Sequence, residues 1–232
     1  AYTFGGEIFL AGGWTTSSES TTLINDIWKS NNGSDWQLVT SNSALPPMHA
    51  SPLIKRKNEL FIIGGDFDEE KHRYVNGIYH SSDGVRWNIV LNKPPWEERV
   101  GIIGFEIDEK LWVLGGQKST HDPRIFESFV PFSDRSFFSD IWQSDDGVRW
   151  KKIEPIVHSN KSWPARGFVL GTFKFKGQIF LIGGHQRVIN KREDGSFSRT
   201  QRLQNDIWRT PDGINWYLVA DSDEVLWREF PT

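Results

Sequence analysis

The chain has 232 residues, which is long enough for one well-buried domain or a small array of repeats. Its formal charge of −3 at pH 7 does not indicate nucleic acid as the main partner, because phosphate binding needs a clear excess of basic residues. The absence of cysteine excludes disulfides, thiolate catalysis and cysteine-ligated metals, and no apolar run is long enough to cross a membrane.

The first predicted element is a short apolar strand that ends in a double glycine, IFLAGG at residues 8–13. A second segment, NDIWKSNNGSDWQLV, follows at residues 25–39. Both signatures then alternate along the chain. The double glycine returns roughly every 50 residues, with one longer last interval, and ends at Gly65, Gly116 and Gly184. The second segment returns at residues 76–90, 139–153 and 205–219, so the chain consists of four copies of one unit.

Each copy is predicted to form four β-strands, because every apolar run is short and closed by glycine and no helical periodicity is present. In the last copy we expect the strands at residues 167–175, 178–182, 206–209 and 216–219. Asp-Gly or Asn-Gly separates the third and fourth strands, which is the strongest short-range signal of a β-hairpin. The predicted fold class is therefore all-β, with four antiparallel four-stranded units in one domain spanning residues 1–232.

The hairpin glycine also predicts how the aromatic residues of each copy are directed. A two-residue turn at Asp83 and Gly84 pairs His80 with Trp87 in the second copy. Tyr79 and Trp87 then point to opposite faces, so that each copy offers one ring to each neighbour. Because the rings recur in every copy, they favour packing between copies over a cofactor site.

These features resemble the kelch repeat of β-propellers, in which a double glycine closes the second strand and a later Trp follows. The resemblance covers essentially the whole chain. The stretches SSDGVRW and SDDGVRW resemble a form of the sialidase Asp-box that is one residue shorter, and in propellers this motif caps the same hairpin. The resemblance implies a β-propeller of four-stranded antiparallel blades with four repeats visible, and the Asp-box carries no implication of sialidase chemistry.

The first and last segments of the chain predict how the ring closes. The first copy begins at Ala1 within its first strand, whereas the last residues, 226–232, resemble the segment that leads into a first strand at residues 162–166. We therefore expect the C-terminal segment to complete the first blade of a closed four-bladed ring. Kelch propellers more often have six or seven blades, so a part of a larger ring is the alternative.

One face of the predicted ring carries connections of very unequal length between the second and third strands, expected at residues 14–24, 66–75, 117–138 and 185–204. Long loops on a rigid repeat scaffold usually carry binding, so this loop-rich face is the expected functional face. The second loop is acidic and the fourth is basic, through Asp66, Asp68, Glu69 and Glu70 and through Arg187, Lys191, Arg192, Arg199 and Arg202. We interpret these as solvated loop charges.

A pairing of Trp and Arg marks the places where the chain enters a first strand. It occurs as Trp96 with Arg99, Trp163 with Arg166 and, at a shorter spacing, Trp227 with Arg228, while His49 stands at this place in the second blade. Guanidinium groups bind carboxylates in a bidentate manner and indole rings cover the apolar faces of sugars. This set therefore predicts a channel mouth that binds an acidic sugar or an acidic peptide. In the structural alternative, the Trp rings fill gaps between blades and the arginines pair with a neighbouring blade's carboxylate, such as Asp140 or Asp206.

No catalytic nucleophile and no acid/base pair held by a third group is recognisable. We therefore expect a non-catalytic binding module with no cofactor and no nucleic-acid partner, which takes a protein or glycan on the loop-rich face. A metal site is not expected either, because His49, His121 and His185 are not spaced as metal ligands. A purely structural segment of a larger surface protein is a third hypothesis.

The enzymatic alternative is a sugar-acting enzyme that resembles the kelch-type sialic acid mutarotases. This resemblance implies that Arg99, Arg166 and Arg228 bind the sugar carboxylate and that Glu97 or Glu98 transfers a proton. Galactose oxidase, a kelch-like enzyme, builds its copper site with a Tyr–Cys crosslink, so the absence of cysteine excludes that activity.

Overall fold

The computed structural model describes residues 1–16, 21–49, 51–68, 71–118, 137–161, 163, 165–167 and 171–221. Within these ranges every regular element is a β-strand, which confirms the all-β prediction. No helix that would be long and apolar enough to span a membrane is found in the same ranges.

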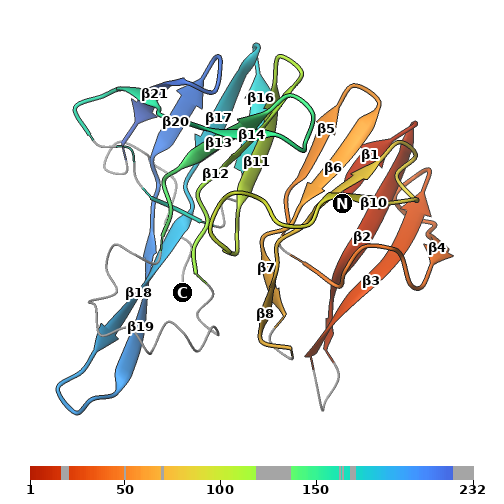
Figure 1. Cartoon of the computed structure of the whole chain (residues 1–232), viewed down its shortest axis with the longest axis horizontal. Coiled ribbons are helices and arrows are strands. Elements are labelled where there is room, and N and C mark those ends of the chain that lie inside the picture. The colour runs from red at the N-terminus through yellow and green to blue at the C-terminus, as the bar shows by residue number, and fades with distance from the viewer. Residues whose placement is uncertain are drawn as a thin grey trace.

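The strands form four consecutive sheets, called blades I to IV here, which stand in a row in chain order with blades I and IV at its two ends (Figure 1). Blade I contains β1 (Tyr2–Phe4), β2 (Glu7–Thr16), β3 (Thr21–Ser30) and β4 (Gln37–Thr40). Blade II contains β5 (Leu53–Arg56), β6 (Glu59–Ile63), β9 (Ile78–Ser81) and β10 (Asn88–Leu91). Blade III contains β11 (Ile103–Ile107), β12 (Lys110–Leu114), β13 (Ile141–Ser144) and β14 (Trp150–Ile153).

Blade IV contains β16 (Gly171–Phe175), β17 (Gln178–Ile182), β20 (Ile207–Thr210) and β21 (Asn215–Ala220). The predicted four-stranded antiparallel meander is thus present, and β17 has the expected bounds. A fifth strand, β15 (Ile156–His158), pairs in parallel with β21 at the outer edge of the sheet and was not predicted. It comes from the connection that leads out of blade III.

The hairpins between the third and fourth strands differ from the predicted two-residue turns. His80 pairs with Asn88, not with Trp87. The reason is that side chains organise a longer turn, in which Ser81 Oγ accepts a hydrogen bond from the Gly84 N–H (2.9 Å) and Asp83 Oδ1 accepts one from the Arg86 N–H (2.7 Å).

This longer turn reverses the predicted direction of one aromatic ring in each blade. In blade III Trp150 pairs with Ser144, so it lies on the same face of the sheet as Trp142. Tyr79 and Trp87 likewise belong to one apolar cluster, which they share with residues of blade I. Both rings of a blade therefore face the preceding blade, and the expectation of one ring for each neighbour was wrong.

Apolar clusters between the sheets hold neighbouring blades together. One cluster joins blades I and II through Phe9 and Leu60, another joins blades II and III through Phe61 and Leu111, and a third joins blades III and IV through Trp112 and Leu181. Among the described residues, no cluster joins blade IV to blade I. The segment 226–232, which was expected to close the ring, lies outside the described residues.

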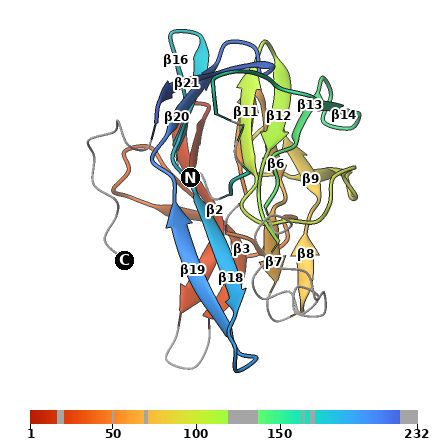
Figure 2. The same ribbon diagram turned by 90° about the vertical axis from the view of Figure 1, so that its left-hand side faces the viewer.

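The described connections between second and third strands project from one side of the row (Figure 1). Most of the third expected loop, residues 119–136, lies outside the described residues. In blades II and IV the connections expected to be long loops contain paired strands. β7 (Asp66–Asp68) and β8 (Arg73–Val75) form one two-stranded ribbon, and β18 (His185–Lys191) and β19 (Phe197–Leu203) form a longer one. Figure 2 shows β18 and β19 running away from the sheet of blade IV. Regular hairpins thus present the expected binding face.

Candidate functional site

Two of the predicted site arginines form buried ion pairs within their own blades. Arg166 is 0% exposed and binds Asp206 in a bidentate manner, with Nη1–Oδ1 and Nη2–Oδ2 distances of 2.9 and 2.7 Å. Arg99 binds Asp140 in the same way, with an Nη2–Oδ2 distance of 3.1 Å. Each arginine precedes the first strand and each aspartate precedes the third, so the pairs tie the two strand starts of one blade together. They do not join neighbouring blades.

The aspartate of each pair also accepts a hydrogen bond from the indole two residues later. The Nε1–Oδ2 distances are 2.8 Å from Trp142 to Asp140 and 2.6 Å from Trp208 to Asp206. Burial alone would raise the pKa of Asp140, but the hydrogen bonds and charge of Arg99 outweigh burial and hold this pKa below its usual range. In blades III and IV the Asp-Ile-Trp signature therefore takes part in a triad of Arg, Asp and Trp around a buried arginine.

Blade II lacks this triad. Gly77 and Tyr79 stand where the other copies have Asp and Trp, and the arginine is absent. In blade I the bond from Trp28 Nε1 to Asp26 Oδ2 is present at 2.7 Å, and the arginine expected there, Arg228, lies outside the described residues. The second copy therefore lacks the residues that form the triad in blades III and IV.

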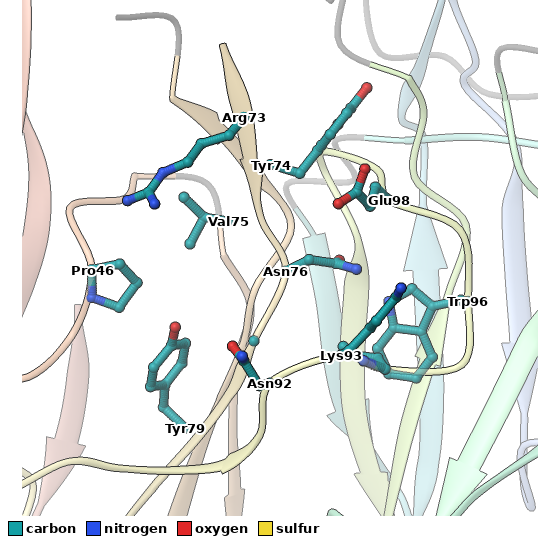
Figure 3. Close-up of a pocket in the computed structure, with 12 residues that line it drawn as sticks. Pro46, Arg73, Tyr74, Val75, Asn76, Tyr79, Asn92, Lys93, Trp96 and Glu98 are labelled. Atoms are coloured by element: carbon teal, nitrogen blue, oxygen red, sulfur yellow. The ribbon is translucent and has the colours of Figure 1, made fainter. Parts of the chain in front are cut away.

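A pocket of about 380 Å³ opens at this place in blade II. Its lining comes from the connections that lead into and out of the blade and from its projecting ribbon: Pro46, residues 73–77, Tyr79, residues 92–94, Trp96 and Glu98. Figure 3 shows Arg73 and Tyr79 on one side, Glu98 and Trp96 on the other, and Asn76 between them. The pocket lies on the loop-rich side of the row, where the sequence predicted binding.

Polar groups without partners in the fold lie in the wall of this pocket. Among the described residues, the buried Oδ1 of Asn76 and the buried Nε1 of Trp96 have no hydrogen-bond partner. A buried polar atom left in this state is costly, which makes it a candidate contact for a ligand. The Trp96 ring is held in place by Trp142 and Trp150, with centroid distances of 5.9 and 5.0 Å.

The charges in the pocket are mixed. Arg73 is 61% exposed and lies 3.9 Å from the carboxylate of Asp68, so its guanidinium can reach a ligand. Lys93 is also exposed, and Glu98 is the acidic residue of the lining. Burial raises the pKa of the Tyr79 hydroxyl, and the charge of Arg73 offsets part of this rise. The phenol therefore stays protonated near neutral pH and can donate a hydrogen bond.

Two acidic side chains of the ribbon beside the pocket are buried, although the sequence led us to expect solvated charges there. Glu69 and Glu70 lie outside the described residues. Asp66 and Asp68 are 2% and 6% exposed. Asp66 Oδ2 accepts hydrogen bonds from the backbone N–H of His49 (2.7 Å) and approaches its Nδ1 (2.8 Å). Burial alone would raise the pKa of Asp66, but these bonds and one from the Phe67 N–H lower it below its usual value. Asp66 thus anchors the connection that leads into blade II.

The predicted site residues are therefore distributed over different places. Trp96 lines the pocket. Trp163 packs against Trp208 and Trp216, with centroid distances of 5.2 and 4.4 Å, in the joint between blades III and IV. His49 stacks on Trp14 at 4.7 Å beside Asp66. Trp227 and Arg228 lie outside the described residues. The described residues contain no group of three or more His, Cys, Asp or Glu side chains that could hold a metal ion.

Sequence reasoning missed the pocket residues Arg73, Asn76, Tyr79 and Lys93. The signal that could have found them is the departure of the second copy from the repeat, where Gly77 replaces the aspartate. In this copy the Tyr79 hydroxyl lies 2.8 Å from where a Cβ of residue 77 would stand, and both residues line the pocket.

Comparison with known proteins supports the fold. No protein-family model matches the sequence, and no curated protein matches it. The solved structure of YjhT, which has a propeller-like fold, is similar with a TM-score of 0.59 and 14% identity. The similarity covers 90% of this chain and 66% of YjhT, so the chain spans slightly less than two thirds of that protein. At this identity the similarity concerns the fold, and it supports a kelch-like propeller arrangement of the blades.

Proposed function

We propose that this chain is a non-catalytic binding module of the kelch-like type that takes a small acidic sugar in the pocket of blade II. The observation that carries the proposal is the coincidence of this pocket with the blade that lacks the buried triad. In blades III and IV an arginine pairs with the aspartate that precedes the third strand. In blade II Gly77 replaces that aspartate and lines the pocket together with polar and aromatic groups.

The chemistry of the lining fits an acidic sugar. Arg73 and Lys93 supply positive charge for a carboxylate, and the indole of Trp96 supplies a flat apolar surface. Asn76 Oδ1 and Trp96 Nε1 offer an acceptor and a donor that the fold leaves without partners. A volume of about 380 Å³ suits a mono- or disaccharide better than an extended peptide, since it lies at the small end of ligand pockets.

Calorimetric titration with glucuronic acid and N-acetylneuraminic acid tests this proposal, with glucose as the neutral comparison. Arg73→Gln and Lys93→Gln should each weaken binding of the acidic sugars by about 1.5–3 kcal/mol if each removes a charge-assisted hydrogen bond. Lys152→Gln, at a 53% exposed lysine outside the pocket, is the matched control and should bind as the wild type does. Equal affinity of wild type and both pocket variants would exclude this site.

The enzymatic alternative is a sugar-acting enzyme resembling the kelch-type sialic acid mutarotases, with its proton transfer placed in the same pocket. Glu98, one of the two acids expected to transfer a proton, lines the pocket together with Tyr74. Arg99 and Arg166, expected on the sugar carboxylate, are engaged with Asp140 and Asp206, so Arg73 and Lys93 take that place in the alternative. Measuring the rate at which a pure sugar anomer equilibrates, by NMR, separates the two functions. A faster rate with wild type than with Glu98→Gln supports the enzyme, and an unaccelerated rate supports the binding module.

A further inference from the structure

The joints between successive blades share one geometry. In each blade one residue of the first strand and its partner in the second lie on the face toward the next blade, which we call the forward face; in blade II these are Ile54 and Phe61, and in the other blades both are aromatic. Tyr2 and Phe9 stack at 5.2 Å, and Trp87 of blade II meets Tyr2 edge-on at 6.2 Å. Phe105 and Trp112 stack at 6.2 Å, and Trp216 of blade IV meets Phe105 edge-on at 6.1 Å. In these two joints a Trp of the following blade thus packs edge-on against the stacked ring pair of the preceding blade.

The hairpin glycine of the following blade completes each joint. A Cβ at Gly147 would lie 2.8 Å from Phe61, and one at Gly213 would lie 2.7 Å from Trp112. A Cβ at Gly84 would lie 3.4 Å from Tyr2. These glycines let the hairpin backbone lie directly on the ring of the preceding blade. The face that carries the hairpin glycine and the Trp is called the rear face.

Blade IV has a complete forward face that no described residue covers. Phe173 and Phe180 stack at 5.5 Å, as the equivalent pairs do in blades I and III. Phe173 is 46% exposed and Phe175 is 54% exposed, whereas the equivalent Phe105 and Ile107 of blade III are 5% and 2% exposed. Aromatic area of this size left in water is unfavourable, which indicates that the face has a partner.

Blade I has the matching rear face, also uncovered among the described residues. Leu10 is 39% exposed, whereas Ile62 and Leu181, its equivalents in blades II and IV, are 6% and 0% exposed. A Cβ at Gly33 would meet only Ile8 of the same blade, with no ring of another blade in contact. Trp36, which is equivalent to Trp87 and Trp216, stands beside this glycine and is half-buried.

We propose that these two end faces are the halves of one joint and that the rear face of blade I in a second copy of this chain docks on the forward face of blade IV. A second copy is favoured because blades I and IV stand at opposite ends of the row, with blades II and III between them (Figure 1). The contact uses two different surfaces, so it is head-to-tail and can add further copies. Its chemistry repeats that of the three joints already present in the chain.

Sedimentation velocity of the wild type over a range of concentrations tests the proposal together with one variant on each face. The wild-type molar mass should rise above the 26.8 kDa of one chain as concentration increases. Phe173→Ser and Leu10→Ser each break one half of the joint and should each remain at one chain. Val148→Ser, at an equally exposed residue (47%) outside both faces, is the control and should associate as the wild type does.

Mixing the two variants gives the decisive measurement. Phe173→Ser retains an intact rear face and Leu10→Ser retains an intact forward face, so the mixture should form a 1:1 dimer that grows no further. Circular dichroism and thermal melts show that each variant is folded before mixing. A wild type that stays at one chain at every concentration overturns the proposal, including the case in which the chain covers its own end faces. Variants that still associate alone, or a mixture that stays monomeric while the wild type associates, overturn it as well.

Discussion

The guanidinium of Arg166 and the carboxylate of Asp206 form a bidentate ion pair inside blade IV, with distances of 2.9 and 2.7 Å. Arg166 also donates to the Gly183 carbonyl at 2.8 Å, so the first glycine of the double-glycine signature takes part in the same network. The two residues are 40 positions apart in the chain and precede β16 and β20. Blade II has no such pair, and there the chain leaves a pocket instead.

Replacing Arg166 by Gln should destabilise the protein strongly, because it leaves a buried carboxylate without its charge partner. Removing one partner of a buried pair costs about 3–5 kcal/mol. The free energy of unfolding from urea titration measures this loss. Arg149→Gln is the control, since Arg149 is 90% exposed, and its effect should stay within about 0.5 kcal/mol. Equal stabilities of the two variants would show that the Arg166 pair does not hold the blade.

Replacing Asn76 by Leu should abolish sugar binding without lowering stability. Its buried Oδ1 has no partner in the described fold, so an apolar side chain of similar size removes an unsatisfied group. The equivalent Asn25 donates from Nδ2 to the carbonyls of Ser43 and Leu45 at 3.1 and 3.0 Å. Asn25→Leu should therefore lower the melting temperature. A loss of stability in Asn76→Leu as large as in Asn25→Leu would assign Asn76 to the fold and not to the pocket.

Comparing Gly213→Ala with Gly195→Ala separates the cost of backbone strain from the cost of crowding in the joint between blades III and IV. Gly213 and Gly195 have nearly the same positive φ, 79° and 83°. A Cβ at Gly213 would lie 2.7 Å from the Trp112 ring, whereas a Cβ at Gly195 would meet nothing within 4 Å. Gly195→Ala should cost about 1–2 kcal/mol for the left-handed backbone alone. Gly213→Ala should cost about 1–3 kcal/mol more, because Trp112 must move. Equal losses in urea titration would contradict this packing.

The hairpin aspartates should make the protein sensitive to acid. Hydrogen bonds from the backbone N–H of Arg149 and of Val148 hold the pKa of Asp146 well below its usual value, although partial burial opposes this. A lowered pKa means that the folded state favours the charged form. This stabilisation is present above the unfolded pKa of about 3.9 and is lost as pH falls below it.

Asp146→Asn should therefore be less stable than the wild type at neutral pH, and the difference should shrink as pH falls from about 4. The measurement is the free energy of unfolding as a function of pH. Asp145→Asn, at the adjacent and 73% exposed residue, should keep the acid dependence of the wild type. A constant difference between wild type and Asp146→Asn across this range would contradict the assignment.

Local sequence patterns predicted the strands and their order well. Apolar runs closed by glycine fixed strands such as β17 at residues 178–182, because a short apolar segment bounded by a turn has few other stable forms. The register of the hairpins was not predictable from Asp83 and Gly84 alone. The Ser81 hydroxyl and the Asp83 carboxylate bind backbone N–H groups and lengthen the turn, which moves Trp87 to the other face.

The sequence by itself determined the repeat, the all-β class and the loop-rich side, since each of these follows from local periodicity and from turn residues. Only the tertiary structure decided whether the arginines that precede the first strands bind a ligand or a carboxylate of the protein itself. Arg99 and Arg166 have the chemistry of a carboxylate site, and folding places Asp140 and Asp206 against them because the starts of the first and third strands meet in each blade. In blade II the aspartate is replaced by Gly77, which lines the pocket beside Tyr79, and this role could be recognised only once residues 92–98 from the next connection were placed against them.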